Sequence, residues 1–138
     1  MTRCIVAVLL LLTAACASVP RETPEDVARA FVAAIERSDA DAMLPLFADD
    51  ATAFFPVNDI PFRADGKPEI EKTFRRLFSN SGGHVVRLPI ENLRVQGRTV
   101  TFEIRNPNVT SRRTLVLEPR GGRWLIVHFH GSNIRVGA

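Results

Sequence analysis

Two histidines, His128 and His130, stand one residue apart in an apolar stretch near the end of the chain. Alternate residues of a β-strand share a face, so this spacing predicts that both side chains lie on the same face as Trp124 and Ile126. Such a pair can act as a general base or supply two ligands to a metal ion, but a catalytic zinc site needs a third protein ligand. His84 is the only other histidine, and no carboxylate has a matching position. We therefore expect no metal and no cofactor, and hydrogen bonding of both histidines in a buried pocket or interface.

Arg105 is the second candidate for chemistry, because it ends a predicted strand that carries Phe102 and Ile104. A guanidinium in a partly dry pocket can bind a ligand carboxylate through two parallel hydrogen bonds. The alternative interpretation is a solvated arginine at a strand end. The pair Arg112-Arg113 is interpreted as a solvated turn.

Other catalytic side chains are scarce. The chain has no tyrosine, and its two cysteines, Cys4 and Cys16, both lie in the N-terminal segment, which excludes a catalytic thiol or a disulfide in the domain itself. Ser132 lacks the strand–turn–helix setting of a nucleophilic serine. Glu103 and Glu118 are on predicted strands without a second carboxylate at a paired spacing. No residue is assigned a catalytic role.

The composition is typical of one globular domain. The 138 residues are 46% hydrophobic and 24% charged, which is enough apolar material for a core. Eighteen basic and fifteen acidic side chains give a formal net charge of +3, and the bases are scattered along the chain. Nucleic-acid binding is not expected, because it depends on clustered positive charge.

Residues 1–15 have the features of a secretory signal peptide. Arg3 supplies the positive charge, an apolar stretch follows over residues 5–12, and the uncharged segment 4–19 is shorter than the ~20 residues of a membrane-spanning helix. The segment Leu12-Thr13-Ala14-Ala15-Cys16 resembles a bacterial lipobox, which implies acylation of Cys16 after cleavage. The alternative is ordinary cleavage after Ala17, which would release a soluble periplasmic or secreted protein.

Residues 16–23 are expected to form a linker before a domain at 24–135. No acidic residue follows Cys16 directly. By resemblance to enterobacterial lipoproteins, this implies an exported protein whose lipid anchor lies in the outer membrane and whose domain faces the periplasm.

The first half of the domain has helical patterns. Thr23-Pro24-Glu25-Asp26 combines a capping residue, a proline at the first helical position and a capping carboxylate. Ser38-Asp39 can cap a second helix, which Pro45 should make brief or kinked. Helices are expected over residues 24–37, 40–47 and 68–78, with a strand over 51–55 and a loop over 56–66 between the second and third.

The second half changes to the period of strands. Val100-Thr101-Phe102-Glu103-Ile104-Arg105 alternates apolar and polar residues, and turn sequences at 96–97, 106–108 and 120–122 join neighbours by short hairpins. These hairpins predict an antiparallel sheet. Strands are expected over 85–88, 93–95, 100–104, 114–117 and 124–129, with Pro89 marking a bulge or edge kink. The fold class is α+β, with three N-terminal helices packed against the sheet.

Two segments resemble the nuclear transport factor 2-like superfamily, also called the SnoaL-like or cystatin-like fold. They are Phe47-Ala48-Asp49-Asp50-Ala51-Thr52 and Gly122-Arg123-Trp124-Leu125-Ile126-Val127-His128-Phe129-His130-Gly131-Ser132. The second is similar to the last strand of the association domain of calcium/calmodulin-dependent protein kinase II and its bacterial SnoaL-like relatives. The resemblance covers residues 24–134 and implies a cone, in which a strongly curved antiparallel sheet wraps a long helix around a pocket. The superfamily includes enzymes, binders and oligomerisation modules, so it implies shape rather than reaction.

Ketosteroid isomerases resemble this chain from Thr23 to Thr52, and they need a tyrosine on the first helix and an aspartate at the end of the first strand. The matching positions are Phe31 and Phe55, which transfer no proton, so that isomerase chemistry is not expected. A pocket lined by Phe31, Phe54, Phe55 and Trp124 would suit an apolar or aromatic ligand. The alternative is that these rings simply fill the core.

The resemblance also bears on the arginines. Arg105 resembles a pocket arginine of the kinase association domains, whose further arginine corresponds to Leu115 here, so a complete carboxylate clamp is not implied. The expected ligand-binding residues are Phe31, Phe54, Phe55, Arg105, Trp124, His128 and His130. The expected function is binding of a small apolar or weakly acidic molecule without catalysis. The alternatives are a cyclase, dehydratase or isomerase with a histidine base, and an oligomerisation module.

The last strand predicts a homodimer. Strict alternation places Leu125, Val127 and Phe129 on one face and Trp124 and Ile126 on the other, so both faces are apolar. The chain's own helices can cover only one of them. A wet apolar face is costly at ~25 cal/mol per Å², and a second copy related by a two-fold axis would cover it.

Overall fold

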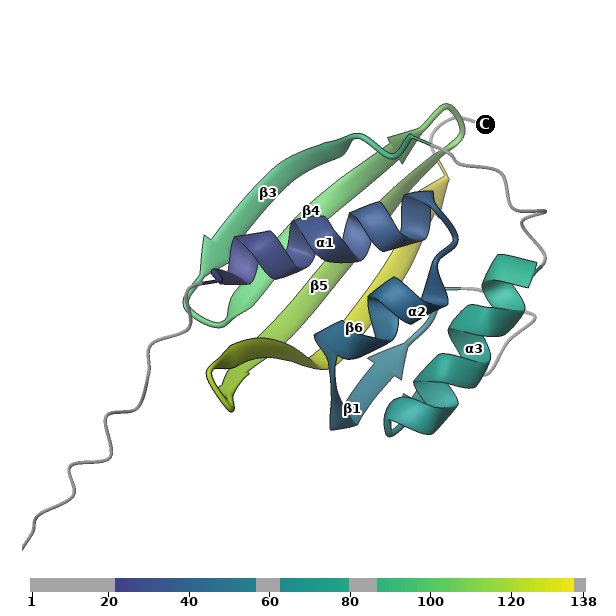
Figure 1. The fold of residues 1–138 in the computed structure, drawn as a ribbon. Helices are drawn as coiled ribbons and strands as arrows, with labels where there is room; N and C mark the ends of the chain where they lie inside the picture. The colour runs from purple at the N-terminus through teal and green to yellow at the C-terminus, as the bar shows by residue number, and fades with distance from the viewer. Residues whose placement is uncertain (1–21, 57–62, 80–86, 136–138) are drawn as a thin grey trace, which may run out of the picture.

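The computed structural model describes residues 22–56, 63–79 and 87–135, with helices on one face of a six-stranded sheet (Figure 1). The predicted signal peptide, Cys16 and His84 lie outside the described residues. The elements are α1 (Pro24–Glu36), α2 (Ala40–Met43), a 3-10 turn (Leu44–Leu46), β1 (Phe47–Phe54), β2 (Arg63–Asp65), α3 (Lys67–Ser79), β3 (Ile90–Gln96), β4 (Thr99–Asn106), β5 (Val109–Arg120) and β6 (Arg123–Arg135).

The first helix begins where its capping residues predict. Thr23 Oγ1 accepts a hydrogen bond from the Asp26 backbone N–H, and Asp26 Oδ2 accepts one from the Thr23 N–H at 2.9 Å. These bonds satisfy two amide groups that have no partner within the helix. α1 then buries one apolar face, which contains Val27, Phe31 and Ala34, against the sheet.

The segment after α1 is more finely divided than predicted. The second helix ends at Met43 and tightens into the 3-10 turn, because Pro45 has no amide N–H for a continuing α-helix. β1 begins at Phe47, four residues before the predicted strand, and the predicted loop 56–66 contains the short strand β2. A strand of only three residues is too short to show an alternating pattern.

The sheet has the order β2-β1-β6-β5-β4-β3 and is mixed. The prediction of an antiparallel sheet is correct for β3 to β6 but wrong for β1, which runs parallel to β6. Hairpin signals constrain only strands that follow one another in the chain, whereas β1 and β6 come from its two ends. The class is nevertheless α+β, with three helices packed on a sheet of six strands that does not close.

The strand predicted over 85–88 is not found in its described part. Arg87, Leu88 and Pro89 are not in a strand, residues 85 and 86 lie outside the described residues, and β3 begins at Ile90. Proline cannot donate to the hydrogen-bond ladder, so Pro89 precedes the strand rather than bending it. The bulge of β3 comes instead between Glu91 and Arg94, where Asn92 has a φ of 53°.

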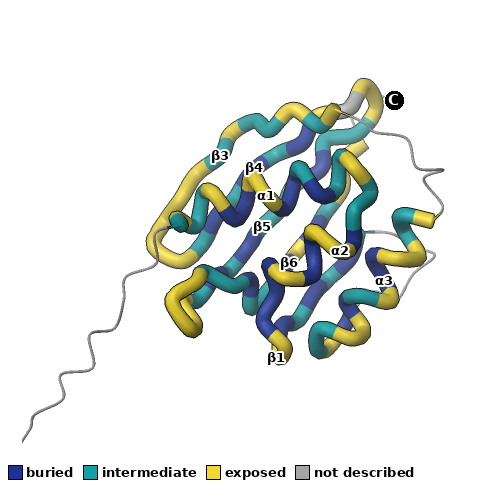
Figure 2. Tube along the Cα trace, in the orientation of Figure 1, coloured by how far each residue is buried: buried dark blue, intermediate teal, exposed yellow. Residues whose placement is uncertain are grey.

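An aromatic cluster forms the centre of the core between the helices and the sheet. Its ring centroids lie 5.2 to 6.2 Å apart, mostly in edge or tilted contacts. Along the strands, buried positions alternate with less buried ones, as the dark blue and teal segments show (Figure 2). The cluster consists of Phe31, Phe47, Phe55, Phe74 and Phe129.

None of the helices in the described residues is long and apolar enough to span a bilayer.

A bulge in β6 reverses the alternation of its side chains. Val116 pairs with His128 and Leu117 pairs with Ile126, so Val127 is an extra residue on β6. Ile126 and Phe129 are therefore both buried on the helix-facing side. The prediction that His128 shares a face with Ile126 is wrong, because strict alternation does not hold across this bulge.

Candidate functional site

The helix-facing side of the sheet is called the inner face here, and the opposite side the outer face. Register assigns Val100, Leu115 and Phe129 to the inner face, and these residues are at most 3% exposed. Their neighbours along the strands, including His128 and His130, point to the outer face. The histidine base of the enzymatic alternative was expected in the pocket, but these two histidines lie on the other side of the sheet from the helices.

The seven predicted ligand-binding residues do not meet in one place. Phe31 and Phe55 are 0% and 2% exposed in the aromatic cluster, so their rings fill the core. Phe54 lies beside His128 and His130 on the outer face, with centroid separations of 5.6 and 5.9 Å.

The two remaining predicted residues also lie apart. Trp124 pairs with Pro119 near the β5–β6 turn and is half-buried against the core. Arg105 is exposed on the outer face, where its Nε lies 3.1 Å from Glu91 Oε2. The expectation of Arg105 as a pocket residue is therefore not supported by its position, because Phe102 and Ile104 are the inward-facing neighbours.

Arg113 lies on the inner face of the sheet, whereas Arg105 lies on the outer face. It pairs with Phe102 on β4 and with Gly131 on β6, and it is half-buried between Ser111 and Leu115 on its own strand. The interpretation of Arg112-Arg113 as a solvated turn is wrong for Arg113, because both residues lie within β5.

The guanidinium of Arg113 is held by neutral oxygen atoms. Its Nη1 donates to the carbonyls of Arg112 at 2.9 Å and Ser132 at 3.1 Å, and to Asn133 Oδ1 at 3.4 Å. Within the described ranges no carboxylate forms an ion pair with it. Burial lowers the pKa of Arg113 to about 10, which still leaves the group charged at neutral pH. A half-buried cation without a counter-ion is costly, and an anionic ligand would offset that cost.

The surroundings of Arg113 combine polar and apolar groups. Ser111 is 6% exposed and donates to Asn133 Oδ1 at 2.9 Å. Phe102 and Ile104 on the neighbouring strand are buried and supply an apolar wall. A carboxylate attached to a small apolar body matches this arrangement, because guanidinium donors recognise the acid while the wall contacts the body.

Gly131 lies directly opposite Arg113 in the ladder. A Cβ at this position would lie 2.8 Å from Pro56 Cδ and 3.2 Å from the Phe129 ring, so the glycine allows the close approach of Pro56 to β6.

A histidine pair occupies the middle of the outer face. Thr52 Oγ1 lies 2.7 Å from His128 Nδ1 across the parallel β1–β6 pair. Burial, and then the charge of His130, lower the pKa of His128, which favours the neutral form of the ring. In the part of the chain that the structure describes, no group of three histidine, cysteine or acidic side chains converges as a metal site.

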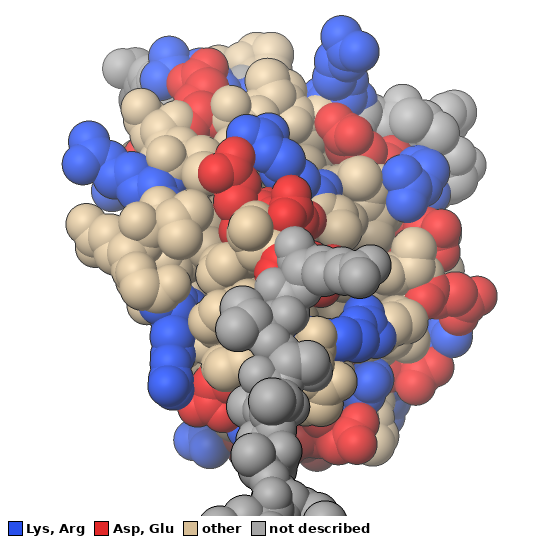
Figure 3. Space-filling model, turned by 60° about the vertical axis from the view of Figure 1, so that its left-hand side comes forward, with Lys and Arg blue, Asp and Glu red and all other residues tan. Residues whose placement is uncertain are grey.

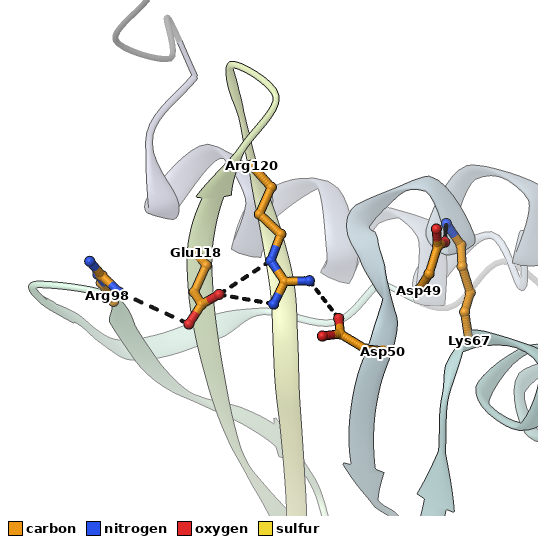
Figure 4. Close-up of polar contacts among 6 residues, drawn as sticks. All are labelled: Asp49, Asp50, Lys67, Arg98, Glu118 and Arg120. Atoms are coloured by element: carbon orange, nitrogen blue, oxygen red, sulfur yellow. Dashed lines mark hydrogen bonds and ion pairs between the residues drawn. The ribbon is translucent and has the colours of Figure 1, made fainter. Parts of the chain in front are cut away.

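A groove of about 680 Å³ opens near the start of β1 and the β5–β6 turn. Its floor includes Leu44 and Pro45, and its charged rim is largely engaged in ion pairs, as Figure 4 shows for Arg120 with Asp50 and for Lys67 with Asp49. On the face drawn in Figure 3, basic and acidic side chains are interspersed without a patch of one sign. The groove therefore shows no clear preference for a charged ligand.

Comparison with known proteins identifies the family. Residues 25–136 match the model of the SnoaL-like domain. The chain belongs to the SnoaL-like domain family. No functionally curated protein matches it.

Solved structures of low sequence identity share the SnoaL-like fold of this chain. A protein of Thiobacillus denitrificans described as a calcium/calmodulin-dependent protein kinase type II association domain has a TM-score of 0.65 at 21% identity, covering 85% of this chain and 98% of that one. A ketosteroid isomerase-like protein of Erwinia carotovora atroseptica has a TM-score of 0.60 at 19% identity, with coverages of 80% and 92%. A Nostoc punctiforme protein of unknown function with a cystatin-like fold has a TM-score of 0.62 at 17% identity, with coverages of 80% and 87%. The predicted resemblance is confirmed, and these likenesses establish the fold alone.

Arg113 is the residue that sequence reasoning missed. Its signal was present in the alternation of β5, where Ser111, Arg113, Leu115 and Leu117 are alternate residues and the last two are apolar. Extending the strand predicted over 114–117 backwards by a single residue would have placed Arg113 on the same face as Leu115.

Proposed function

We propose that this SnoaL-like domain binds a small molecule that carries a carboxylate and an apolar body, and that it does so without catalysis. The observation that supports this proposal is the half-buried Arg113 guanidinium, which faces inward and has only neutral oxygen partners among the described residues. The carboxylate would bond to Arg113, and the body would contact the apolar wall of Phe102 and Ile104.

In the part of the chain that the structure describes, no histidine or carboxylate pairs with Arg113, which supports binding rather than catalysis. Phe31 and Phe55 replace the two groups that ketosteroid isomerases use, and both are buried hydrocarbon rings. Among the described residues the histidines lie on the outer face, away from the guanidinium. This geometry therefore supports binding more than it supports an enzyme that uses a histidine as its base.

The test compares two probes that differ only in charge, 2-naphthoate and 2-naphthamide. Calorimetric titration of residues 18–138, which contain every described helix and strand, should give tighter binding of the acid than of the amide. Arg113→Gln should weaken naphthoate binding by about tenfold or more, because a hydrogen bond to a charged group contributes ~1.5–3 kcal/mol. Arg112→Gln is the matched control, since it lies next along β5 but points to the outer face and pairs with Glu103. Equal binding of acid and amide, or equal losses in both variants, would contradict the proposal.

We also propose that the domain is exported and attached to the outer membrane through acylated Cys16. The support is the apolar segment and the lipobox-like residues 12–16. Cys16→Ser should move the protein from the membrane fraction to the soluble periplasm, with the wild-type chain as the control. Unchanged fractionation together with a mature N-terminus at Ser18 would contradict lipidation and favour cleavage after Ala17.

A further inference from the structure

A hollow of about 320 Å³ lies between α3 and β2, the strand at one edge of the sheet. We call it the α3–β2 recess. It lies on the β1 side of the molecule (Figure 1) and shares no lining residue with the groove beside the β5–β6 turn. Its lining residues are Arg63, Ala64, Glu69, Lys72, Thr73 and Arg76.

The bottom of this recess is closed by fixed side chains. Ala64 is 1% exposed and Thr73 is 5% exposed. Thr73 Oγ1 donates to the Glu69 carbonyl at 2.9 Å, so the hydroxyl has its partner within the helix. Towards the start of α3, Glu69 Oε2 accepts a hydrogen bond from the Asp65 backbone N–H at 2.8 Å and so joins the helix to β2. The recess is therefore a shaped space between two elements that are bonded to each other.

Positive charge exceeds negative charge around the recess. Lys72 and Arg76 are four residues apart on α3, so they lie on the same side of the helix. Within the ranges that the structure describes, neither side chain has an ion pair. Arg63 adds a third positive charge from β2, and its Nε donates to Asp65 Oδ1 at 2.9 Å. Glu69 is the only acidic side chain in the lining.

The neighbouring arginine of the same helix is held differently. Arg75 Nε lies 2.8 Å from Glu71 Oε1, and Arg75 Nη2 lies 2.6 Å from Asp41 Oδ1. Four residues before Arg75 the chain places a glutamate, whereas four residues before Arg76 it places Lys72. Like charges at this spacing disfavour a helix. An anion bound between Lys72 and Arg76 would offset that repulsion.

The basic groups of the recess suit an anion with more than one charged oxygen. A guanidinium donates through a planar fork, and an ammonium group is a compact phosphate-binding charge. Here both kinds of donor come together from two elements. A phosphate monoester carries close to two negative charges at neutral pH and three acceptor oxygens. The volume is near the lower end for small-molecule sites, which favours a small ester.

We propose that the α3–β2 recess binds the phosphoryl group of a small phosphate monoester, with Lys72, Arg76 and Arg63 as donors. Arg113 lies on β5, three strands away from β2 in the sheet, or roughly 14 Å at the usual strand spacing. The recess is therefore separate from the acid site proposed at Arg113, and neither proposal depends on the other.

The experiment is a calorimetric titration of residues 18–138 with phenyl phosphate and with benzoate, at pH 8.0 and constant ionic strength. Phenyl phosphate should bind more tightly than benzoate, because it carries the larger charge. Lys72→Gln and Arg76→Gln should each weaken phenyl phosphate binding roughly tenfold or more, as expected for loss of a charge-assisted hydrogen bond. Arg75→Gln is the matched control, since it removes the same charge from the same helix and should leave binding unchanged. Lys72 and Arg76 are exposed, so both variants should fold, which circular dichroism checks.

Two further measurements separate the recess from other sources of binding. The double variant Lys72→Gln/Arg76→Gln should still bind 2-naphthoate like the wild-type chain, because that probe is directed at Arg113. Residues 18–138 should not sediment with phosphatidylglycerol vesicles, whose phosphoryl groups lie in a lipid surface.

Four results would overturn the proposal. Benzoate that binds as tightly as phenyl phosphate would exclude a preference for the phosphoryl group. Equal losses in the Lys72, Arg76 and Arg75 variants would show a general effect of charge, and loss of 2-naphthoate binding in the double variant would show that the two sites are not separate. Sedimentation with vesicles that the double variant abolishes would assign the recess to lipid headgroups instead of a small ester.

Discussion

The inner and outer faces of this sheet treat polar side chains differently. On the inner face nearly all positions are apolar and at most a few per cent exposed, and Arg113 is an exception that has no carboxylate partner among the described residues. On the outer face polar side chains are common, and the charged ones at its borders form ion pairs with one another. Polarity on the outer face therefore has a structural explanation in its own neighbours, whereas no described carboxylate balances the charge of Arg113.

The comparison also separates two uses of aromatic rings. Phe31 lies in ring contacts with Phe47, Phe74 and Phe129 and is fully buried. Phe54 is half-buried on the outer face and contacts the rings of two histidines. The first ring stabilises the core, and the second packs beside the two imidazoles on the outer face.

The largest expected effect comes from removing an inner ring. Phe31→Ala should lower the free energy of unfolding by about 3–5 kcal/mol, because it leaves a cavity in the aromatic cluster. Phe54→Ala, the matched change on the outer face, should cost no more than about 1–2 kcal/mol, because part of that ring is already exposed. Urea unfolding at the same low protein concentration measures both. Equal losses would show that the two faces are not distinct in packing.

The next effect comes from the glycine opposite Arg113. Gly131→Ala should destabilise the fold by about 1–3 kcal/mol, because the new Cβ would press on Pro56 and the Phe129 ring. Ser132→Ala, one residue further and on the outer face, serves as the control in the same unfolding measurement. A fully stable Gly131→Ala protein would show that Pro56 is free to move away from β6.

A smaller effect is expected at the threonine beside His128. Thr52→Val keeps the shape of the side chain but removes the hydroxyl 2.7 Å from His128 Nδ1. The free energy of unfolding should fall by about 0.5–1.5 kcal/mol, which is the usual contribution of a neutral hydrogen bond. Thr110→Val, opposite Arg105 near one end of the outer face, removes a hydroxyl that forms no side-chain hydrogen bond within the described residues, so it should change the free energy of unfolding little in the same urea titration. An unaltered midpoint for Thr52→Val would exclude a stabilising role for this bond.

The smallest effect is a shift in titration. His130→Gln should raise the pKa of His128, because the charge of His130 contributes to lowering it. When the pKa of a histidine is lower in the folded state than in the unfolded state, the unfolded state takes up the proton first as the pH falls, and the protein loses stability. A variant with a higher His128 pKa should therefore lose less stability between pH 7 and pH 5. NMR titration of the His128 ring follows the pKa directly. An unchanged pKa would leave burial as its only cause.

The fold was predictable from sequence where local rules apply. The capping residues before α1 and the hairpin turns of β3 to β6 each depend on a few consecutive residues, and they appear as predicted. The parallel pairing of β1 with β6 could not be predicted in the same way, because it joins segments that are far apart in the chain.

The candidate site was less predictable, for a reason that lies in two strands. The bulge at Val127 moves His128 and His130 to the outer face, and a one-residue change of phase reverses every following side chain. β5 begins five residues before the predicted strand, so Arg113 falls inside a strand instead of a turn. Arg105 lies near the end of β4 and Arg113 lies within β5, and only the register shows which of them points inward.

The most direct test of the central claim is an NMR titration of the arginine side chains with 2-naphthoate. Signals of Nε–H groups in residues 18–138 would be assigned with Arg113→Lys and Arg112→Lys. We expect the Arg113 signal to shift on addition of the acid, while the Arg112 signal and the His128 ring signals on the outer face stay in place. A titration in which Arg113 does not respond, or in which the outer-face signals respond in its place, would contradict an acid-binding inner face.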